Sequence, residues 1–197
     1  MFDSIIQIVA FIIQIALDFL IFMLMIRLVV QIHQTNLANP FVKLVYRITD
    51  FLAKPTVRII PPWKGVEYGL IVTMLILAVL QVVLVVWVRF DHFPSLFAVM
   101  AWPVAEIGSQ FINVYFYALI IYVIFNWIHL DPTQPVFEVI LTITRPLLAP
   151  FRRFFNLRGA GLTLAILSVA VLLKLVDIIL FTPIVRTVSV QAALGVM

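Results

Sequence analysis

Charged and amide side chains interrupt long apolar stretches of this sequence at positions where they could do chemistry. Asp18 lies near the middle of the first stretch, Gln14 lies one helical turn before it, and Asn113 lies in the third stretch. Lys174 and Asp177 lie three residues apart in the last stretch. If these stretches cross a membrane, a charge at that depth costs at least ~2.5 kcal/mol, so the groups should face the protein interior and pair. Together they could line a path for an ion or a proton.

The composition indicates that these groups belong to a membrane protein. Hydrophobic residues make up 64% of the 197 positions, the mean hydropathy is +1.19, and only 11% of the residues are charged. A soluble globular domain has a much more polar composition. The chain has no cysteine, which excludes disulfides, thiolate catalysis and cysteine-ligated zinc. We therefore expect an all-α integral membrane protein.

Four segments are long and apolar enough to span a bilayer. They cover about residues 5–30, 69–88, 111–128 and 162–181. The first segment does not resemble a signal peptide, because Asp3 precedes it without any Lys or Arg and no cleavage site follows. The stretch from Phe93 to Ile107 contains two prolines and a glutamate and is too short to cross. We expect it to rest at the membrane interface, with a re-entrant dip as the alternative.

Two stretches between the spans, 39–61 and 134–156, repeat each other at a shift of 95 residues. The residues that match are Pro40 with Pro135, Ile48 with Ile143, Thr49 with Thr144, Leu52 with Leu147, Pro55 with Pro150 and Arg58 with Arg153. The chain is therefore two tandem units of helix, connector and helix. We expect a first repeat at 1–91, an interfacial linker at 92–108 and a second repeat at 109–197. Parallel repeats of this kind are related by a pseudo-twofold axis along the membrane normal.

The connectors are predicted to be amphipathic helices that lie on the membrane surface, at about 40–54 and 135–150. Asn39 can cap the first helix, Pro40 fits its first position, and Pro55 should end it. Its apolar face is expected to carry Phe41, Leu44, Val45, Ile48, Phe51 and Leu52. Its polar face carries Lys43, Arg47, Asp50 and Lys54, whereas the second connector has only Glu138, Thr142 and Arg145 there.

The basic residues of the connectors are candidates for binding anionic lipid or a membrane-protein partner, including a second copy of the chain. These candidates are Lys43, Arg47, Lys54, Arg58, Arg145, Arg152 and Arg153. The plainer interpretation is a tether that only fixes the spans relative to the bilayer. The apolar residues interleaved with the basic ones suit a lipid surface better than nucleic acid, so no nucleic-acid partner is expected.

The distribution of basic residues predicts the orientation. Nine of the 13 Lys and Arg residues lie in the two connector regions, on one side of the expected membrane. The positive-inside rule assigns that side to the cytoplasm, so both termini should face outward.

The intramembrane charges have a purely structural interpretation as well. Asp18 could form a salt bridge with Lys174 that fixes how the first span packs on the fourth, and Lys174 could also extend toward the interface. At the shift of 95, Asp18 corresponds to Asn113 and Lys174 to Val79, so the charges are not duplicated. A pore on the repeat axis would lack a symmetric polar lining, which favours the salt bridge.

The repeated pattern resembles a known family. In the first copy it comprises Arg27, Asn39-Pro40-Phe41, Thr49, Pro55, Arg58 and Pro61-Pro62. In the second it comprises Asn126-Trp127, Gln134-Pro135 and the run from Thr144 to Arg153. This pattern is similar to that of the YggT family of bacterial inner-membrane proteins, over nearly the whole chain. The resemblance implies a multi-pass protein of the bacterial inner membrane, linked to osmotic-shock tolerance and potassium uptake. Relatives of the YlmG type are linked to division-site or nucleoid organisation and to cytochrome assembly in plastids.

Two functions from different classes remain open. The first, which the resemblance favours, is a part in osmotic tolerance or in potassium or other ion homeostasis. The second is a non-enzymatic membrane organiser or assembly factor whose connectors bind lipid or partners. The sequence has no P-loop, no HExxH or CxxC motif and no TVGYG-like filter, so we expect neither an enzyme nor a cofactor. His33, His92 and His129 lie near span ends, far apart in sequence, and are not expected to form a metal site.

Overall fold

The computed structural model describes residues 2–90, 93–153 and 160–187 of the chain. Its elements are α1 (Phe2–Ile32), α2 (Pro40–Ile59), α3 (Gly69–Phe90), α4 (Leu96–Trp127), α5 (Pro135–Leu148), a 3₁₀ turn (Pro150–Arg153) and α6 (Ala160–Leu180). Four of them, α1, α3, α4 and α6, are long and apolar enough to cross a membrane by length and composition. These helices confirm the predicted all-α architecture with four spans and two connector helices.

One predicted boundary is wrong, because residues 93–107 do not form a separate interfacial segment. They belong largely to α4, a continuous helix whose start is capped by Ser95, and Pro103 is buried inside it. A proline removes one helical hydrogen bond, but the adjacent Trp102 packs against Val82 and Val86 of α3, and this contact with another helix supports the backbone here. The repeat already contained this information, since α1 shifted by 95 residues predicts a helix over 97–127.

The first connector helix is longer than predicted, because Pro55 does not end it. Asn39 caps its start as expected, accepting a hydrogen bond from the Phe41 amide at 2.9 Å. The last turn beyond Pro55 is held against α3, where a Cβ on Gly69 would lie 2.9 Å from the Thr56 carbonyl. The Thr56 hydroxyl also contacts the Thr73 hydroxyl of α3. Close packing on α3 thus stabilises a turn that the proline alone would disfavour.

The apolar residues of α2 divide between two faces, where one face was predicted. Val42, Val45 and Ala53 are buried against the protein. Leu44 and Phe51 are 51% and 65% exposed on the outside of the helix. The helix therefore packs on the bundle through one face and presents a second apolar face outward.

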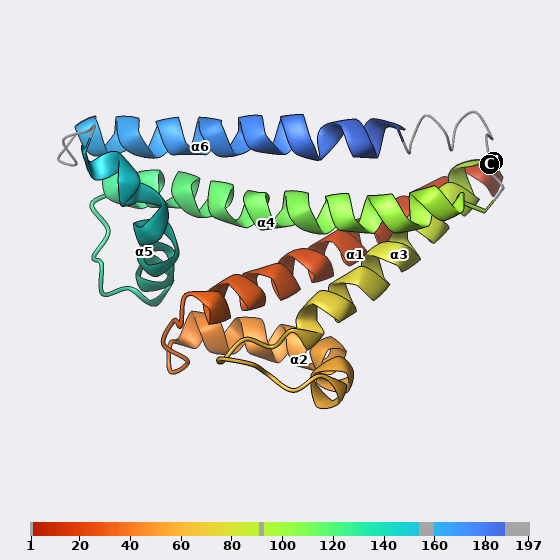
Figure 1. Ribbon diagram of the computed structural model, residues 1–197, viewed down its shortest axis with the longest axis horizontal. Coiled ribbons are helices and arrows are strands. Elements are labelled where there is room, and N and C mark those ends of the chain that lie inside the picture. The colour runs from red at the N-terminus through yellow and green to blue at the C-terminus, as the bar shows by residue number, and fades with distance from the viewer. Residues whose placement is uncertain (1, 91–92, 154–159, 188–197) are drawn as a thin grey trace.

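Helix α4 is the centre of the bundle and contacts α1, α3, α5 and α6. Helix α6 packs against α4 and α5, so it lies at the edge of the row (Figure 1). A twofold axis between the repeats would exchange α1 with α4 and α3 with α6. The extensive packing of α3 on α4 would then be accompanied by equally extensive packing of α6 on α1. Over residues 2–90, 93–153 and 160–187 the structure has only the first of these, so the copies are not arranged around the predicted twofold axis.

Both connector helices lie at the same end of the bundle (Figure 1). The Asn39 amide joins them by donating to the Pro135 carbonyl at 2.8 Å and to the Glu138 carboxylate at 2.9 Å. The placement of both connectors at one end agrees with the predicted topology of two hairpins.

Candidate functional site

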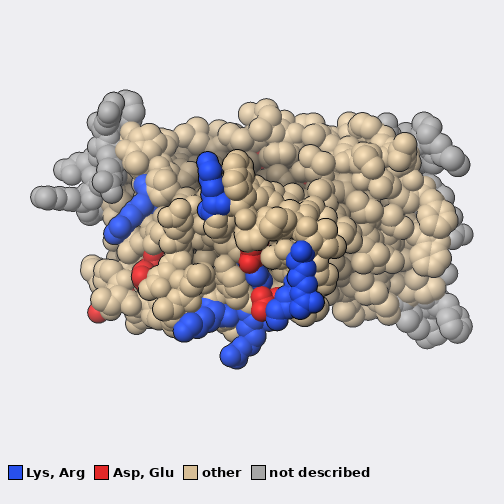
Figure 2. Space-filling view, turned by 60° about the horizontal axis from the view of Figure 1, so that its bottom comes forward, with Lys and Arg blue, Asp and Glu red and all other residues tan. Residues whose placement is uncertain are grey.

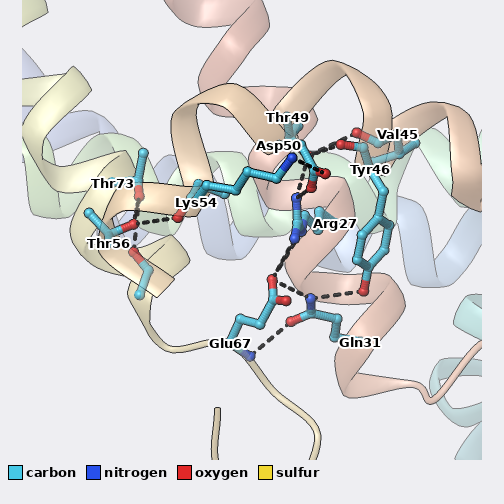
Figure 3. Close-up of polar contacts among 12 residues, drawn as sticks. Arg27, Gln31, Val45, Tyr46, Thr49, Asp50, Lys54, Thr56, Glu67 and Thr73 are labelled. Carbon is cyan, nitrogen blue, oxygen red and sulfur yellow. Dashed lines mark hydrogen bonds and ion pairs between the residues drawn. The ribbon is translucent and has the colours of Figure 1, made fainter. Parts of the chain in front are cut away.

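A buried arginine near the connector end of α1 binds groups from two other segments. Arg27 is only 4% exposed. Its guanidinium donates to Asp50 at 2.8 Å and to the Thr49 hydroxyl at 3.0 Å, both on α2. It also binds the Glu67 carboxylate through two nitrogens, at 3.0 and 2.8 Å (Figure 3). Both nitrogens meet the same carboxylate oxygen, Oε2, so the contact is a charge-assisted pairing with one acceptor atom.

Neighbouring side chains complete this network, which we call the Arg27 cluster. It comprises Arg27, Gln31, Tyr46, Thr49, Asp50 and Glu67. The Gln31 amide donates to the Tyr46 hydroxyl at 2.9 Å and to Glu67 at 2.8 Å, and its carbonyl accepts from the Glu67 backbone amide at 2.9 Å. The Arg27 guanidinium lies 4.1 Å from the centre of the Tyr46 ring. The cluster therefore ties α1, α2 and the loop before α3 together.

Asp50 links the buried Arg27 cluster to a charged residue on the protein surface, Lys54. The exposed Lys54 binds Oδ2 of this carboxylate at 3.2 Å, while the buried Arg27 binds Oδ1. Partial burial acts to raise the pKa of Asp50, but the hydrogen bonds and charges of Arg27 and Lys54 outweigh it and lower the pKa. Asp50 is thus held as an anion between a buried and an exposed cation.

A basic groove of about 570 Å³ lies on the outer side of α2, beside the Arg27 cluster. It is lined by Leu37, Val42, Lys43, Tyr46, Arg47, Asp50, Phe51 and Lys54. Figure 2 shows Lys and Arg gathered at the connector end of this face, while the part of the same face away from the connectors shows no charged side chain. Three cations beside an aromatic ring and a tyrosine can bind a phosphate group together with adjoining apolar atoms.

The other predicted basic residues do not line this groove. Arg58 is exposed in the last turn of α2, and Arg145 is exposed on α5. The side chains of Arg152 and Arg153 lie outside the described part of the structure. The groove thus brings together Lys43, Arg47 and Lys54 and leaves the second connector apart.

The intramembrane residues have different partners from those predicted. Asp18 accepts a hydrogen bond from the Gln81 amide of α3 at 2.7 Å. Lys174 binds Asn113 of α4 and, at 3.1 Å, Asp177 of its own helix. The expected ion pair between Asp18 and Lys174 is therefore wrong, because α4 lies between the two helices that carry them. Asp18 and Lys174 each bind an amide side chain of an adjacent helix instead.

Sequence reasoning missed several polar groups that belong to these networks. Glu106 on α4 accepts from Gln110 at 3.2 Å and lies within electrostatic range of Asp18 and Asp177. Once α4 is one helix, the spacing of Glu106, Gln110 and Asn113 (i, i+4 and i+7) places them on one face. Placing Glu106 in a linker at 92–108 and starting the span only at 111 hid this pattern.

Arg27 was also missed as a site residue. The signal for it was present, because Arg27 and Gln31 stand one turn apart near the end of an apolar span and share a helix face. Polar residues so placed are expected to find buried partners.

Comparison with known proteins places this architecture in a family. A family model described as CCB3/YggT matches residues 6–88 and again residues 101–184. The chain belongs to the CCB3/YggT family. The two CCB3/YggT matches begin 95 residues apart, which is the shift found in the sequence.

A relative with no described function is also similar to this CCB3/YggT protein. The chain is 28% identical over 156 residues to the uncharacterized protein PA0392 of Pseudomonas aeruginosa, covering 79% of each protein. No solved structure matches the chain.

The first prediction concerns the buried arginine. Replacing Arg27 with Met should lower the free energy of unfolding by roughly 3–5 kcal/mol, because Asp50 and Glu67 would be left without their buried cation. Lys54→Gln is the matched control, and it should cost less than about 1 kcal/mol because this partner is exposed. Unfolding in mixed micelles, followed by circular dichroism, measures both. Equal losses for the two variants would contradict a central role for Arg27.

The second prediction concerns acid stability. Because the pKa of Asp50 is lowered in the folded protein, its ion pairs stabilise the fold fully above the ordinary Asp pKa of about 3.9. This stabilisation is lost as the pH falls through the lowered pKa. Asp50→Asn should therefore lower the melting temperature at neutral pH and flatten its decline below about pH 4. Melting curves across this range would argue against the cluster if wild type and variant declined in parallel.

Proposed function

We propose that this CCB3/YggT-family protein is a non-enzymatic membrane organiser. In this proposal the groove on α2 holds anionic lipid headgroups at the cytoplasmic face of the bacterial inner membrane, and both termini face outward. The observation that carries the proposal is the grouping of Lys43, Arg47 and Lys54 in one groove. The connector regions carry nine of the 13 basic residues, which supports the cytoplasmic assignment.

The surface of α2 suits the boundary between headgroups and acyl chains. The exposed apolar residues Leu44, Phe51 and Ile59 form a stripe along the helix, directly beside the stripe of basic residues. A helix with this pattern can place its apolar stripe against acyl chains and its cations among phosphates. Because its third face is packed on α1 and α3, the helix is held in one orientation for this contact.

The two connectors are not equivalent in this proposal. Glu138 occupies the position in α5 that Lys43 occupies in α2, and Arg145 occupies that of Asp50. Val139 and Ile143 are buried in α5, whereas Leu44, the counterpart of Val139, is exposed. The second connector therefore serves mainly to support the bundle, and the first one meets the lipid.

The third prediction tests the lipid contact. Each cation near an anionic surface contributes about 1 kcal/mol, so reversing two groove charges, Lys43→Glu and Arg47→Glu, should reduce enrichment of phosphatidylglycerol by about tenfold or more. Native mass spectrometry of protein taken from nanodiscs of mixed phosphatidylglycerol and phosphatidylcholine measures the retained lipid. Lys64→Glu is the control, since Lys64 lies in the loop outside the groove. Unchanged retention in the groove variant would refute the proposal.

A role in osmotic-shock tolerance through potassium or other ion homeostasis is the second candidate. It is supported by the polar groups that the four spans contribute inside the bundle: Asp18, Gln81, Glu106, Asn113, Lys174 and Asp177. Intramembrane ionisable residues commonly mark ion or proton pathways.

The fourth prediction separates the two candidates. If the protein itself moves ions, proteoliposomes that contain it should show potassium flux, and Asp18→Asn and Lys174→Met should each reduce that flux at least tenfold. The groove variant Lys43→Glu, Arg47→Glu is the control and should leave the flux unchanged. A wild-type flux no greater than that of empty vesicles would exclude transport by this chain alone.

A further inference from the structure

The hydrogen bonding of Gln81 is incomplete in a way that points to a missing proton. Gln81 is 3% exposed, and its Nε2 donates to Asp18 Oδ1 at 2.7 Å. Its Oε1 is buried and has no hydrogen-bond partner among the described residues. A buried amide normally satisfies both its donor and its acceptor, so a donor directed at Oε1 is lacking.

A protonated Asp18 would supply that donor. A carboxylic acid carries one O–H donor beside a carbonyl acceptor, and a primary amide carries an N–H donor beside a carbonyl acceptor at similar spacing. The two groups can therefore form a pair with two parallel hydrogen bonds, one from Nε2 to Oδ1 and one from the acid O–H to Oε1. An ionised Asp18 keeps only the first bond and turns a second acceptor toward Gln81.

Within the described part of the chain, the surrounding charges do not supply a cation for an ionised Asp18. Helix α3 has no charged residue except Arg89 near its far end, and the charge that α4 presents is another carboxyl, Glu106, on which Asp18 acts electrostatically. Lys174 of α6 is engaged by Asn113 and Asp177. On α1 itself, Arg27 lies more than two turns away and is held by the Arg27 cluster, as are the α2 charges Asp50 and Lys54. An anion in mid-membrane without a cation is strongly disfavoured.

A small cavity of about 30 Å³ adjoins this pair and is large enough for a water molecule. It is lined by Ala10, Ile13, Gln14, Leu17, Gln81, Leu84, Val85 and Val88. The connector follows α1 and precedes α3. The cavity residues of α1 all come before Asp18 in the sequence, and those of α3 are Gln81 and residues after it, so both sets extend away from the connector. The cavity therefore lies on the side of Asp18 that faces the end opposite α2 and α5.

We propose that Asp18 and Gln81 form a proton-binding site inside the membrane, with the small cavity beside it on the side opposite the connectors. The ligand is a proton, held on the Asp18 carboxyl and shared in a hydrogen bond with Gln81 Oε1. The biological use of the site rests on the second candidate function, ion homeostasis, but the site itself can be tested without measuring flux.

The fifth prediction is that dicyclohexylcarbodiimide modifies Asp18 at neutral pH. The reagent takes the proton of a carboxylic acid on nitrogen, the carboxyl oxygen then bonds its central carbon, and the adduct rearranges to a stable N-acylurea. An ionised carboxylate does not react in this way. Wild-type protein in proteoliposomes should gain one adduct on the peptide that contains Asp18, and labelling should fall at least tenfold as the pH is raised. Peptide mass spectrometry measures this.

Two variants and a change of the cation in the buffer complete the experiment. Asp18→Asn should abolish labelling of that peptide, and Glu106→Gln should retain it. Because Asn can form the same two hydrogen bonds with Gln81, Asp18→Asn should also keep the melting temperature of wild type. The proposal is overturned if Asp18 is unlabelled at neutral pH, or if replacing choline with potassium or sodium at constant pH suppresses labelling, which would indicate a metal-cation site. Labelling without potassium flux would reject only transport by this chain, and flux without labelling would reject only the proton site.

Discussion

The structure depends on the pairing of one guanidinium in an apolar environment. Arg27 cannot lose its charge, so burying it requires anions and acceptors on several sides. Asp50 and Thr49 provide them from α2, and Glu67 provides them from the loop before α3. Satisfying this one side chain therefore fixes the rotation of α2 about its axis. The rotation in turn decides which side chains of α2 face the bundle and which face outward.

The sequence was sufficient to predict the parts of the fold that local patterns determine. Apolar length predicted the spans, and Asn39-Pro40 predicted where α2 begins. The effects of Pro55 and Pro103 could not be predicted in the same way, because each proline is accommodated by packing on another helix. Contacts such as that of Gly69 with Thr56 join residues distant in sequence, and they outweigh a local preference to break the helix.

The candidate sites show the same division between local and distant information. The free-energy cost of placing a charged side chain inside the membrane identified Asp18 and Lys174 as residues that need partners, and both have them. The identity of those partners depended on the order of helices in the bundle, which places α4 between α1 and α6. Gln81 carries no local pattern that singles it out, and the pattern of Glu106 is visible only once α4 is read as one helix. Only the assembled helices bring both residues near Asp18.

The main hydrophobic core has a consequence for how the protein is made. Its buried residues come from both repeats: Ile21, Val42 and Met74 from the first, and Ala118 and Ile143 from the second. During synthesis the first hairpin leaves the ribosome before α4 exists, so its inner surface must meet lipid or an insertion factor for a time. Folding of the first half is thus completed only after translation of the second, and a chain that stops between the repeats would be a substrate for membrane proteases.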